Sequence, residues 1–212
     1  MKNSNENKRE LVKKDYDAIA DLYIEHCDNN DIVLPFIDRF INSLNGKSVL
    51  DVGCGSGKIA NYFFSKGLHS KGVDFSIEMI MRARNKYPQV DFVCEDICNY
   101  HPQEKFDGIF SKYLLFHLPP EDIKSTLLNF YNMMNEDGKL CVIIDIPKVK
   151  GEQVLIEEFD NSQKIYYNYI TIDELETALK QAQFKIEDKI ILENNDISAE
   201  YAYGIVVVYA SK

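Results

Sequence analysis

The chain has 212 residues, of which 45% are hydrophobic and 27% charged, a composition typical of globular proteins. Its 24 Lys and Arg against 34 Asp and Glu give a net charge of −10, which argues against general nucleic-acid binding and against docking on an anionic membrane. The amino-terminal MKNSNENKRE has no apolar segment, and no apolar run approaches the roughly 20 residues that span a bilayer. We therefore expect a cytoplasmic protein, with its five cysteines reduced.

The acidic residues are unevenly distributed along the chain. Residues 151–200 contain twelve Asp and Glu against four Lys, a net charge of −8, so the remainder is close to neutral. The length is typical of one domain.

Hydrophobic periodicity and turn residues predict helices first and then alternating strands and helices. The expected helices are residues 10–26, 33–44, 59–66, 76–87, 119–134 and 173–183. The expected strands are residues 48–52, 69–74, 90–94, 106–111, 139–145, 184–192 and 201–209. We expect residues 146–170 to be irregular.

Alternating strands and helices are typical of an α/β fold with a doubly wound, mostly parallel, Rossmann-like sheet, here of seven strands. The last two strands are joined by about eight polar residues, too few for a parallel crossover, so the final strand should be antiparallel. The first two helices would form a lid.

Three glycines follow the first predicted strand, in the run VLDVGCGSGK that includes Asp51, Gly53, Cys54 and Gly55. Glycines between a buried strand and a helix let a nucleotide-like ligand approach the backbone closely. The run matches neither the phosphate-binding P-loop nor the G-x-G-x-x-G dinucleotide pattern. An acid two residues before the first glycine would repel a pyrophosphate, so it favours a cationic ligand without phosphate, or a role in ordering the loop.

VLDVGCGSG followed by GVDFS resembles the first two motifs of class I S-adenosylmethionine (SAM)-dependent methyltransferases. Further segments similar to that family follow in order: VCEDI, FDGIFS, LFHL, DGKL and IDEL. The resemblance covers roughly residues 10–210 and implies a small-molecule methyltransferase. It implies these cofactor-binding residues: Tyr16, Tyr23, Asp51, Gly53, Cys54, Gly55, Asp74, Phe75, Ser76, Met79, Asp96, Ile97, Ser111 and Lys112.

Within that set, the resemblance implies that Asp74 accepts both ribose hydroxyls and that Asp96 accepts the adenine amino group. Gly57 is expected to serve helix–strand packing. Tyr16 and Tyr23 resemble the tyrosines of the family's lid helix, and they also fit an aromatic stripe packed on the core.

His117 is the candidate catalytic residue, because it can take a proton from an acceptor at neutral pH; the alternative is a structural hydrogen bond. The candidate substrate-binding residues are Tyr113, His117, Tyr166 and Tyr169. Glu157, Glu158 and Asp160 lie in the expected acceptor segment, where they would suit a cationic acceptor or form a solvated acidic face.

Cys94, Cys98 and His101 do not form a metal site, because a zinc site needs four ligands and no second pair exists at ligand spacing. The expected cofactor is therefore SAM without a metal, and the expected partner is a small-molecule acceptor.

We expect a single domain over 1–212, as a monomer or homodimer. It comprises a lid (1–45), a SAM-binding core (46–145), an acceptor segment (146–170) and a last helix with two strands (171–212). The alternatives are a nicotinamide-dependent oxidoreductase and a non-catalytic SAM-binding or partner-binding protein.

Overall fold

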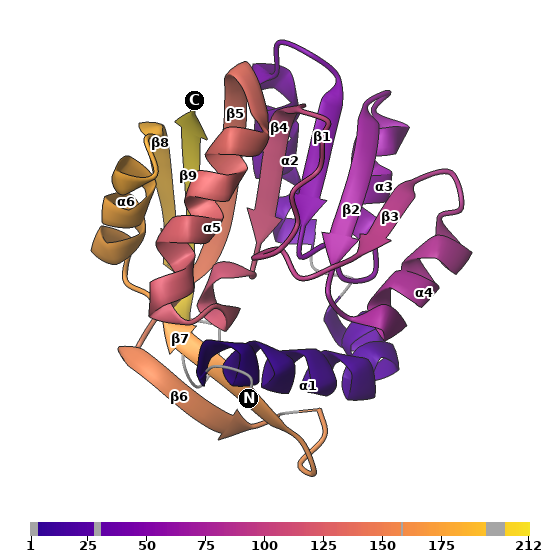
Figure 1. Cartoon of the computed structure of the whole chain (residues 1–212), viewed down its shortest axis with the longest axis vertical. Coiled ribbons are helices and arrows are strands. Elements are labelled where there is room, and N and C mark those ends of the chain that lie inside the picture. The colour runs from indigo at the N-terminus through magenta and orange to yellow at the C-terminus, as the bar shows by residue number, and fades with distance from the viewer. Residues whose placement is uncertain (1–3, 28–30, 158, 194–201) are drawn as a thin grey trace.

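The computed structural model describes residues 4–27, 31–157, 159–193 and 202–212 (Figure 1). The helices are α1 (Ser4–Cys27), α2 (Leu34–Ser43), α3 (Lys58–Ser65), α4 (Ile77–Lys86), α5 (Pro120–Met133) and α6 (Ile172–Gln181), with short 3₁₀ turns at Asp31–Val33 and Leu115–His117. The strands are β1 (Ser48–Val52), β2 (His69–Asp74), β3 (Asp91–Cys94), β4 (Phe106–Lys112), β5 (Met134–Pro147), β6 (Gly151–Ile156), β7 (Lys164–Tyr169), β8 (Lys185–Glu193) and β9 (Ala202–Ser211).

Seven strands form the main sheet in the order β3-β2-β1-β4-β5-β9-β8. Strands β1 to β5 pair in parallel, and β9 runs antiparallel to both β5 and β8. The prediction of a doubly wound, mostly parallel sheet with an antiparallel last strand is confirmed. Because the parallel strands end at one edge, the loops that follow Val52, Asp74, Cys94 and Lys112 gather there.

Two apolar layers hold helices on both faces of this sheet. On one face, Phe40 of α2 and Phe63 of α3 pack on Phe110 of β4, with ring centroids 5.6–5.9 Å apart. On the other face, Leu127 and Phe130 of α5 are fully buried in the largest core cluster. Helix α1 lies across the carboxyl edge of the sheet (Figure 1).

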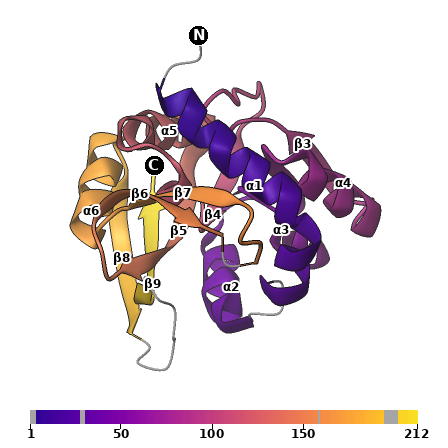
Figure 2. The same cartoon turned by 90° about the horizontal axis from the view of Figure 1, so that it is seen from below.

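The expectation that residues 146–170 are irregular is wrong. They contain an antiparallel hairpin, β6–β7, which lies beside α1 (Figure 2). The local hydrophobic pattern does not indicate this hairpin, since Val154 and Ile156 on β6 are exposed. The buried contact of the hairpin is with α1, where Val12 packs on Ile165 and Tyr166. The hairpin is therefore stabilised by a helix distant in sequence.

Several predicted boundaries also differ from those of the structure. Helix α1 begins at Ser4 instead of residue 10, because its polar first turns are anchored by ion pairs and do not depend on an apolar stripe. Strand β5 runs from Met134 to Pro147, longer than the expected 139–145, since it pairs along its length with β9. Of the described helices, none has the length and apolar character needed to cross a membrane.

Candidate functional site

The glycine loop joins β1 to α3 with three residues in the left-handed region, where φ is +70° at Gly53, +49° at Gly55 and +77° at Gly57. A Cβ atom at Gly57 would lie 2.5 Å from the Phe92 ring, which supports the expected packing role. A Cβ atom at Gly55 would meet nothing within 4 Å. The loop is therefore tightly packed at Gly57 and open at Gly55.

Asp74, at the end of β2, orders the loop. One carboxyl oxygen accepts a hydrogen bond from the Gly55 N–H at 2.9 Å, and the other accepts from the Ser76 N–H at 2.9 Å. Burial raises the pKa of Asp74 to about 6, although the hydrogen bonds from the Ser76 and Gly55 N–H groups act to lower it. Ser76 in turn caps α4 by accepting from the Met79 N–H, and donates to Asp17 of α1 at 2.6 Å.

Asp51 lies beside Asp74 and is only 2% exposed. One of its carboxyl oxygens has no hydrogen-bond partner among the described residues, and the same holds for the Ser111 hydroxyl. Burial, followed by the charge of Asp74, raises the pKa of Asp51 to about 7, while Lys112 opposes the shift. A buried acid with an unused oxygen at a cavity suits a ligand that carries a positive charge.

Two of the cavities in the described structure meet the glycine loop at this edge of the sheet. The first, of about 270 Å³, is lined by predicted residues Tyr23, Asp51, Gly53, Cys54, Gly55, Lys112 and Tyr113. A smaller one, of about 30 Å³, is lined by predicted residues Gly53, Asp74, Phe75, Asp96, Ile97 and His117, and also by Arg9. The structure thus gathers most of the predicted cofactor residues around two cavities that are both lined by Gly53.

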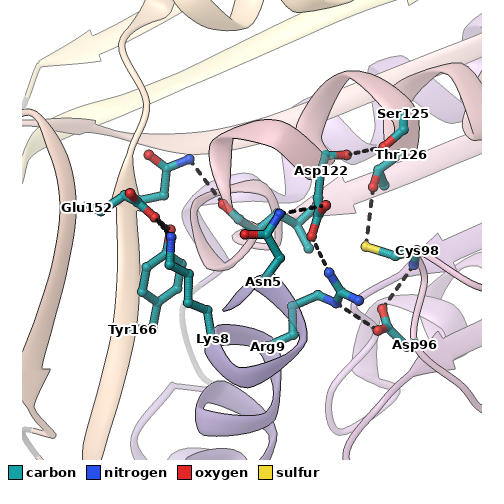
Figure 3. A network of polar contacts seen from close by, with 12 residues as sticks. Asn5, Lys8, Arg9, Asp96, Cys98, Asp122, Ser125, Thr126, Glu152 and Tyr166 are labelled. Atoms are coloured by element: carbon teal, nitrogen blue, oxygen red, sulfur yellow. Dashed lines mark hydrogen bonds and ion pairs between the residues drawn. The ribbon is translucent and has the colours of Figure 1, made fainter. Parts of the chain in front are cut away.

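Asp96, which follows β3, is bound by the lid helix (Figure 3). Its carboxylate accepts from Arg9 Nε at 2.8 Å and from the Cys98 N–H at 3.0 Å. Arg9 also pairs with Asp122 of α5, and its side chain is only 11% exposed. Sequence reasoning missed Arg9, because nothing in its local sequence indicates a partner on a distant strand.

Lys8 anchors the same helix to the hairpin. It pairs with Glu152 of β6, which also accepts from the Tyr166 hydroxyl at 2.6 Å (Figure 3). The Tyr166 side chain therefore faces Lys8 and Glu152, and lines neither of the two cavities.

His117 is buried and bonded through both ring nitrogens. Nδ1 lies 3.1 Å from the Tyr166 carbonyl oxygen, which can only accept, so Nδ1 carries the proton. Nε2 then presents a lone pair, and the Tyr16 hydroxyl donates to it at 2.9 Å. Burial lowers the pKa of His117 to about 4, so the ring is neutral at neutral pH and burial opposes its protonation.

The remaining predicted residues lie outside the two cavities. Tyr169 stacks on Tyr167 with ring planes 9° apart, and the side chain of Met79, on α4, is buried. Glu158 falls outside the described residues.

Cys98 and His101 are engaged with neighbours on α5. The Cys98 sulfur lies 3.5 Å from the Thr126 hydroxyl, and His101 Nδ1 lies 2.9 Å from the Asn129 side-chain oxygen. Within the described part of the chain, no group of three or more His, Cys, Asp or Glu converges as a metal site would require.

Comparison with known proteins places this site in context. Residues 49–138 match the family model of a methyltransferase domain. The ubiquinone biosynthesis O-methyltransferase of Coxiella burnetii is 34% identical over 116 residues, which are 52% of this chain and 48% of that protein. The chain spans about half the length of several curated relatives that it matches.

Solved structures share the fold. The 1,6-didemethyltoxoflavin-N1-methyltransferase of Burkholderia thailandensis, solved with 1,6-didemethyltoxoflavin and S-adenosylhomocysteine, matches with a TM-score of 0.78 at 18% identity over 100% of this chain and 92% of that one. The magnesium protoporphyrin IX methyltransferase of Synechocystis PCC 6803, solved with SAM, matches with a TM-score of 0.74 at 16% identity over 100% of both chains.

Proposed function

We propose that this chain transfers the methyl group of SAM to an oxygen, nitrogen or sulfur atom of a small-molecule acceptor. Residues 49–138 match the model of a methyltransferase domain, and the fold is shared with solved SAM-dependent methyltransferases, which supports the proposal. The observation that carries this proposal is the pair of acids beside the open glycine loop, the buried Asp51 and the partly buried Asp74. That arrangement suits a cation without phosphate.

SAM fits the residues present, because its sulfonium and ammonium groups are positive and it carries no phosphate. The unused oxygen of Asp51 would face the positively charged methionine end, which Gly53 and Gly55 also line. Asp74 would hold the ribose hydroxyls and Asp96 the adenine amino group, as in the family that the sequence resembles. When bound, SAM supplies a methyl group already activated by its sulfonium.

The chain itself must then position the acceptor and take up its proton. Tyr16 and His117 form a hydrogen-bonded pair, and His117 lines the smaller cavity. An acceptor proton can pass to the Tyr16 oxygen while the Tyr16 proton moves to His117 Nε2, and the acceptor lone pair becomes free to take the methyl group. The Tyr166 carbonyl holds the imidazole in the tautomer that this transfer needs.

We propose that the four segments of the chain form a single domain for this reaction. We assign residues 1–45 to the lid, 46–145 to cofactor binding, 146–170 to the acceptor side and 171–212 to completion of the sheet. A cytoplasmic monomer or homodimer without nucleic-acid partners is part of the same proposal. The 1,6-didemethyltoxoflavin bound to the Burkholderia enzyme supports a small-molecule acceptor.

Calorimetry with SAM and S-adenosylhomocysteine tests the proposal. We expect micromolar binding, and about 100-fold weaker binding in Asp74→Ala, because that change removes a charged acceptor that also orders Gly55 and Ser76. Asp91→Ala, at an exposed position on β3, is the matched control and should bind as the wild type does. A wild-type chain that binds neither compound would overturn the proposal.

Turnover needs a second measurement. A screen of small amines, phenols and carboxylic acids, read by formation of S-adenosylhomocysteine, should identify an acceptor. Binding of SAM without turnover of any acceptor would instead favour a non-catalytic SAM-binding protein.

A further inference from the structure

Arg9 of α1 lies between two carboxylates that belong to two other segments of the chain (Figure 3). Its Nε donates to Oδ2 of Asp96, which follows β3, at 2.8 Å, and its Nη1 donates to Asp122 in the first turn of α5. The two carboxylate side chains are 23% and 20% exposed, so both ion pairs are largely shielded from water. One guanidinium therefore joins three segments that are distant in the sequence.

Both carboxylate oxygens of Asp96 already accept a hydrogen bond. Oδ1 accepts from the Cys98 N–H at 3.0 Å, a bond within the same turn that fixes the orientation of the side chain. Oδ2 is the oxygen directed at α1, and it accepts from Arg9. Under the proposed function, the adenine amino group of SAM donates to this carboxylate. It would therefore need the oxygen that Arg9 occupies.

The same ion pair forms the boundary between two cavities. The inner one is the cavity of about 30 Å³ that Ile97 also lines, and the outer one, of about 400 Å³, reaches exposed surface at Asn99. Four residues line both cavities: Arg9, Phe75, Glu95 and Asp96. The inner cavity has room for about two water molecules, far less than a purine base requires. An adenine ring can therefore reach Ile97 only if the Arg9 side chain moves.

We propose that Arg9 competes with the adenine amino group for Asp96, so that the Arg9–Asp96 ion pair is a gate that SAM must open. This inference rests on the proposed function and adds Arg9 to the residues that determine cofactor affinity. SAM enters from the outer cavity, and its amino group replaces the Arg9 Nε–H at Oδ2 of Asp96. Arg9 stays paired with Asp122, so neither carboxylate is left without a partner.

Cofactor affinity and anchoring of α1 are opposed in this arrangement. The bond from Arg9 to Asp96 holds the helix against the turn after β3, and the same bond must break when adenine binds. Asp122 lowers the cost of that step, because it offers the guanidinium a second carboxylate and is itself held by Asn5 of α1 at 3.3 Å. Arg9 is thus a positioning residue that acts through Asp96.

Calorimetry with S-adenosylhomocysteine on the full chain supplies the first test. Arg9→Gln should bind it about 5-fold more tightly, because no ion pair has to break, although the variant holds α1 less firmly. Lys8→Gln is the matched control: it removes the same charge from the same helix, but Lys8 pairs with Glu152 of β6 and should leave affinity within about 2-fold of wild type. Equal or weaker binding by Arg9→Gln would overturn the inference.

Asp122→Asn separates the gate from a general loosening of α1. This change removes an ion pair between α1 and α5 and leaves Arg9 on Asp96. Amide exchange in α1 should accelerate, as in Arg9→Gln, but binding of S-adenosylhomocysteine should weaken about 2-fold, since the guanidinium loses its second partner. Binding strengthened as much as in Arg9→Gln would show that any loosening of the helix admits the cofactor, and would overturn the gate.

Adenosine tests whether the effect belongs to the adenine end of the site. It lacks the methionine end of SAM, so Arg9→Gln should strengthen its binding by the same factor of about 5. A gain for S-adenosylhomocysteine without a gain for adenosine would overturn the gate and leave the proposed function standing. No binding of either compound by the wild type or by any variant would overturn the proposed function, and the gate with it.

Discussion

Asp51 and Asp15 are both buried aspartates with a pKa raised to about 7, in two regions built differently. Asp51 belongs to one continuous segment, in which strand, acid and glycine loop follow one another along the chain. Asp15 acquires its environment only when α1 docks against the hairpin and brings Glu157 next to it. The carboxyl edge of the sheet around the glycine loop (the cofactor edge) is thus specified by local sequence. The contact between α1 and the β6–β7 hairpin (the lid seam) depends instead on segments that are distant in the chain.

The largest effect should come where the two regions meet, at the Tyr16–His117 hydrogen bond. With an acceptor from the screen whose nucleophile is protonated, His117→Asn should reduce kcat about 100-fold and Tyr16→Phe about 10-fold. The double variant should be little worse than His117→Asn alone, because both changes interrupt one proton path.

Steady-state kinetics on the wild type, the two single variants and the double variant give the double-mutant cycle, with SAM affinity measured in parallel. Losses in kcat that multiply in the double variant would show two independent roles. Losses confined to SAM affinity would instead assign both residues to the cofactor site.

The rigidity of the cofactor edge can be tested with two of its glycines. Gly57→Ala should lower the free energy of unfolding by about 2–3 kcal/mol, because a Cβ atom would clash with Phe92 at a positive φ. Gly55→Ala is the matched control, since it has positive φ without a clash and should cost about 1 kcal/mol.

Urea unfolding of the two variants measures this difference. Equal destabilisation would mean that Phe92 moves aside, and that backbone conformation alone explains the choice of glycine. A larger cost at Gly57 would confirm that helix–strand packing fixes this end of the loop.

The same contrast explains which features could be predicted from sequence. The strand before Gly53, the loop and the Ser76 cap of α4 depend on neighbours in the chain, and pattern indicated all of them. The parallel pairing of β1 to β5 follows from the alternation of strands with helices. The hairpin could not be predicted, because its stability depends on burial of Ile165 and Tyr166 under α1.

Long-range pairing also limited the site prediction. Tyr16 and His117 were each identifiable as candidates, but their mutual hydrogen bond requires the helix to lie across the sheet. The pairing of Arg9 with Asp96 has no local signal on either side. The identity of Glu157 as the partner of Asp15 likewise follows from packing between segments and has no signature in sequence.

The lid seam should show its own pH dependence. The folded-state pKa of Asp15 is raised above its unfolded value, so its contribution to stability is present below about pH 4 and is lost as the pH rises to about 7. Asp15→Asn removes this loss and should stabilise the chain by about 1–2 kcal/mol at pH 8, with little gain at pH 4.5.

Chemical denaturation of both proteins across this range measures the difference, in which the opposite contribution of His117 cancels. A stabilisation of equal size at both pH values would show that Asp15 is not protonated in the folded chain. A destabilisation at pH 8 would show that the carboxylate has a favourable partner in the seam.

The smallest effect concerns how firmly α1 is held at the adenine end of the site. Arg9→Gln removes charged bonds to Asp96 and Asp122, and should cost about 1 kcal/mol of local stability because the guanidinium is largely buried. Amide hydrogen exchange in α1 should then accelerate about 5-fold. Lys8→Gln is the matched control in the same helix, and since its pair with Glu152 is more exposed, it should accelerate exchange less than 2-fold. If both variants accelerate exchange equally, anchoring of the lid does not depend on Asp96, and the lid seam is coupled to the cofactor edge through Tyr16 and His117 alone.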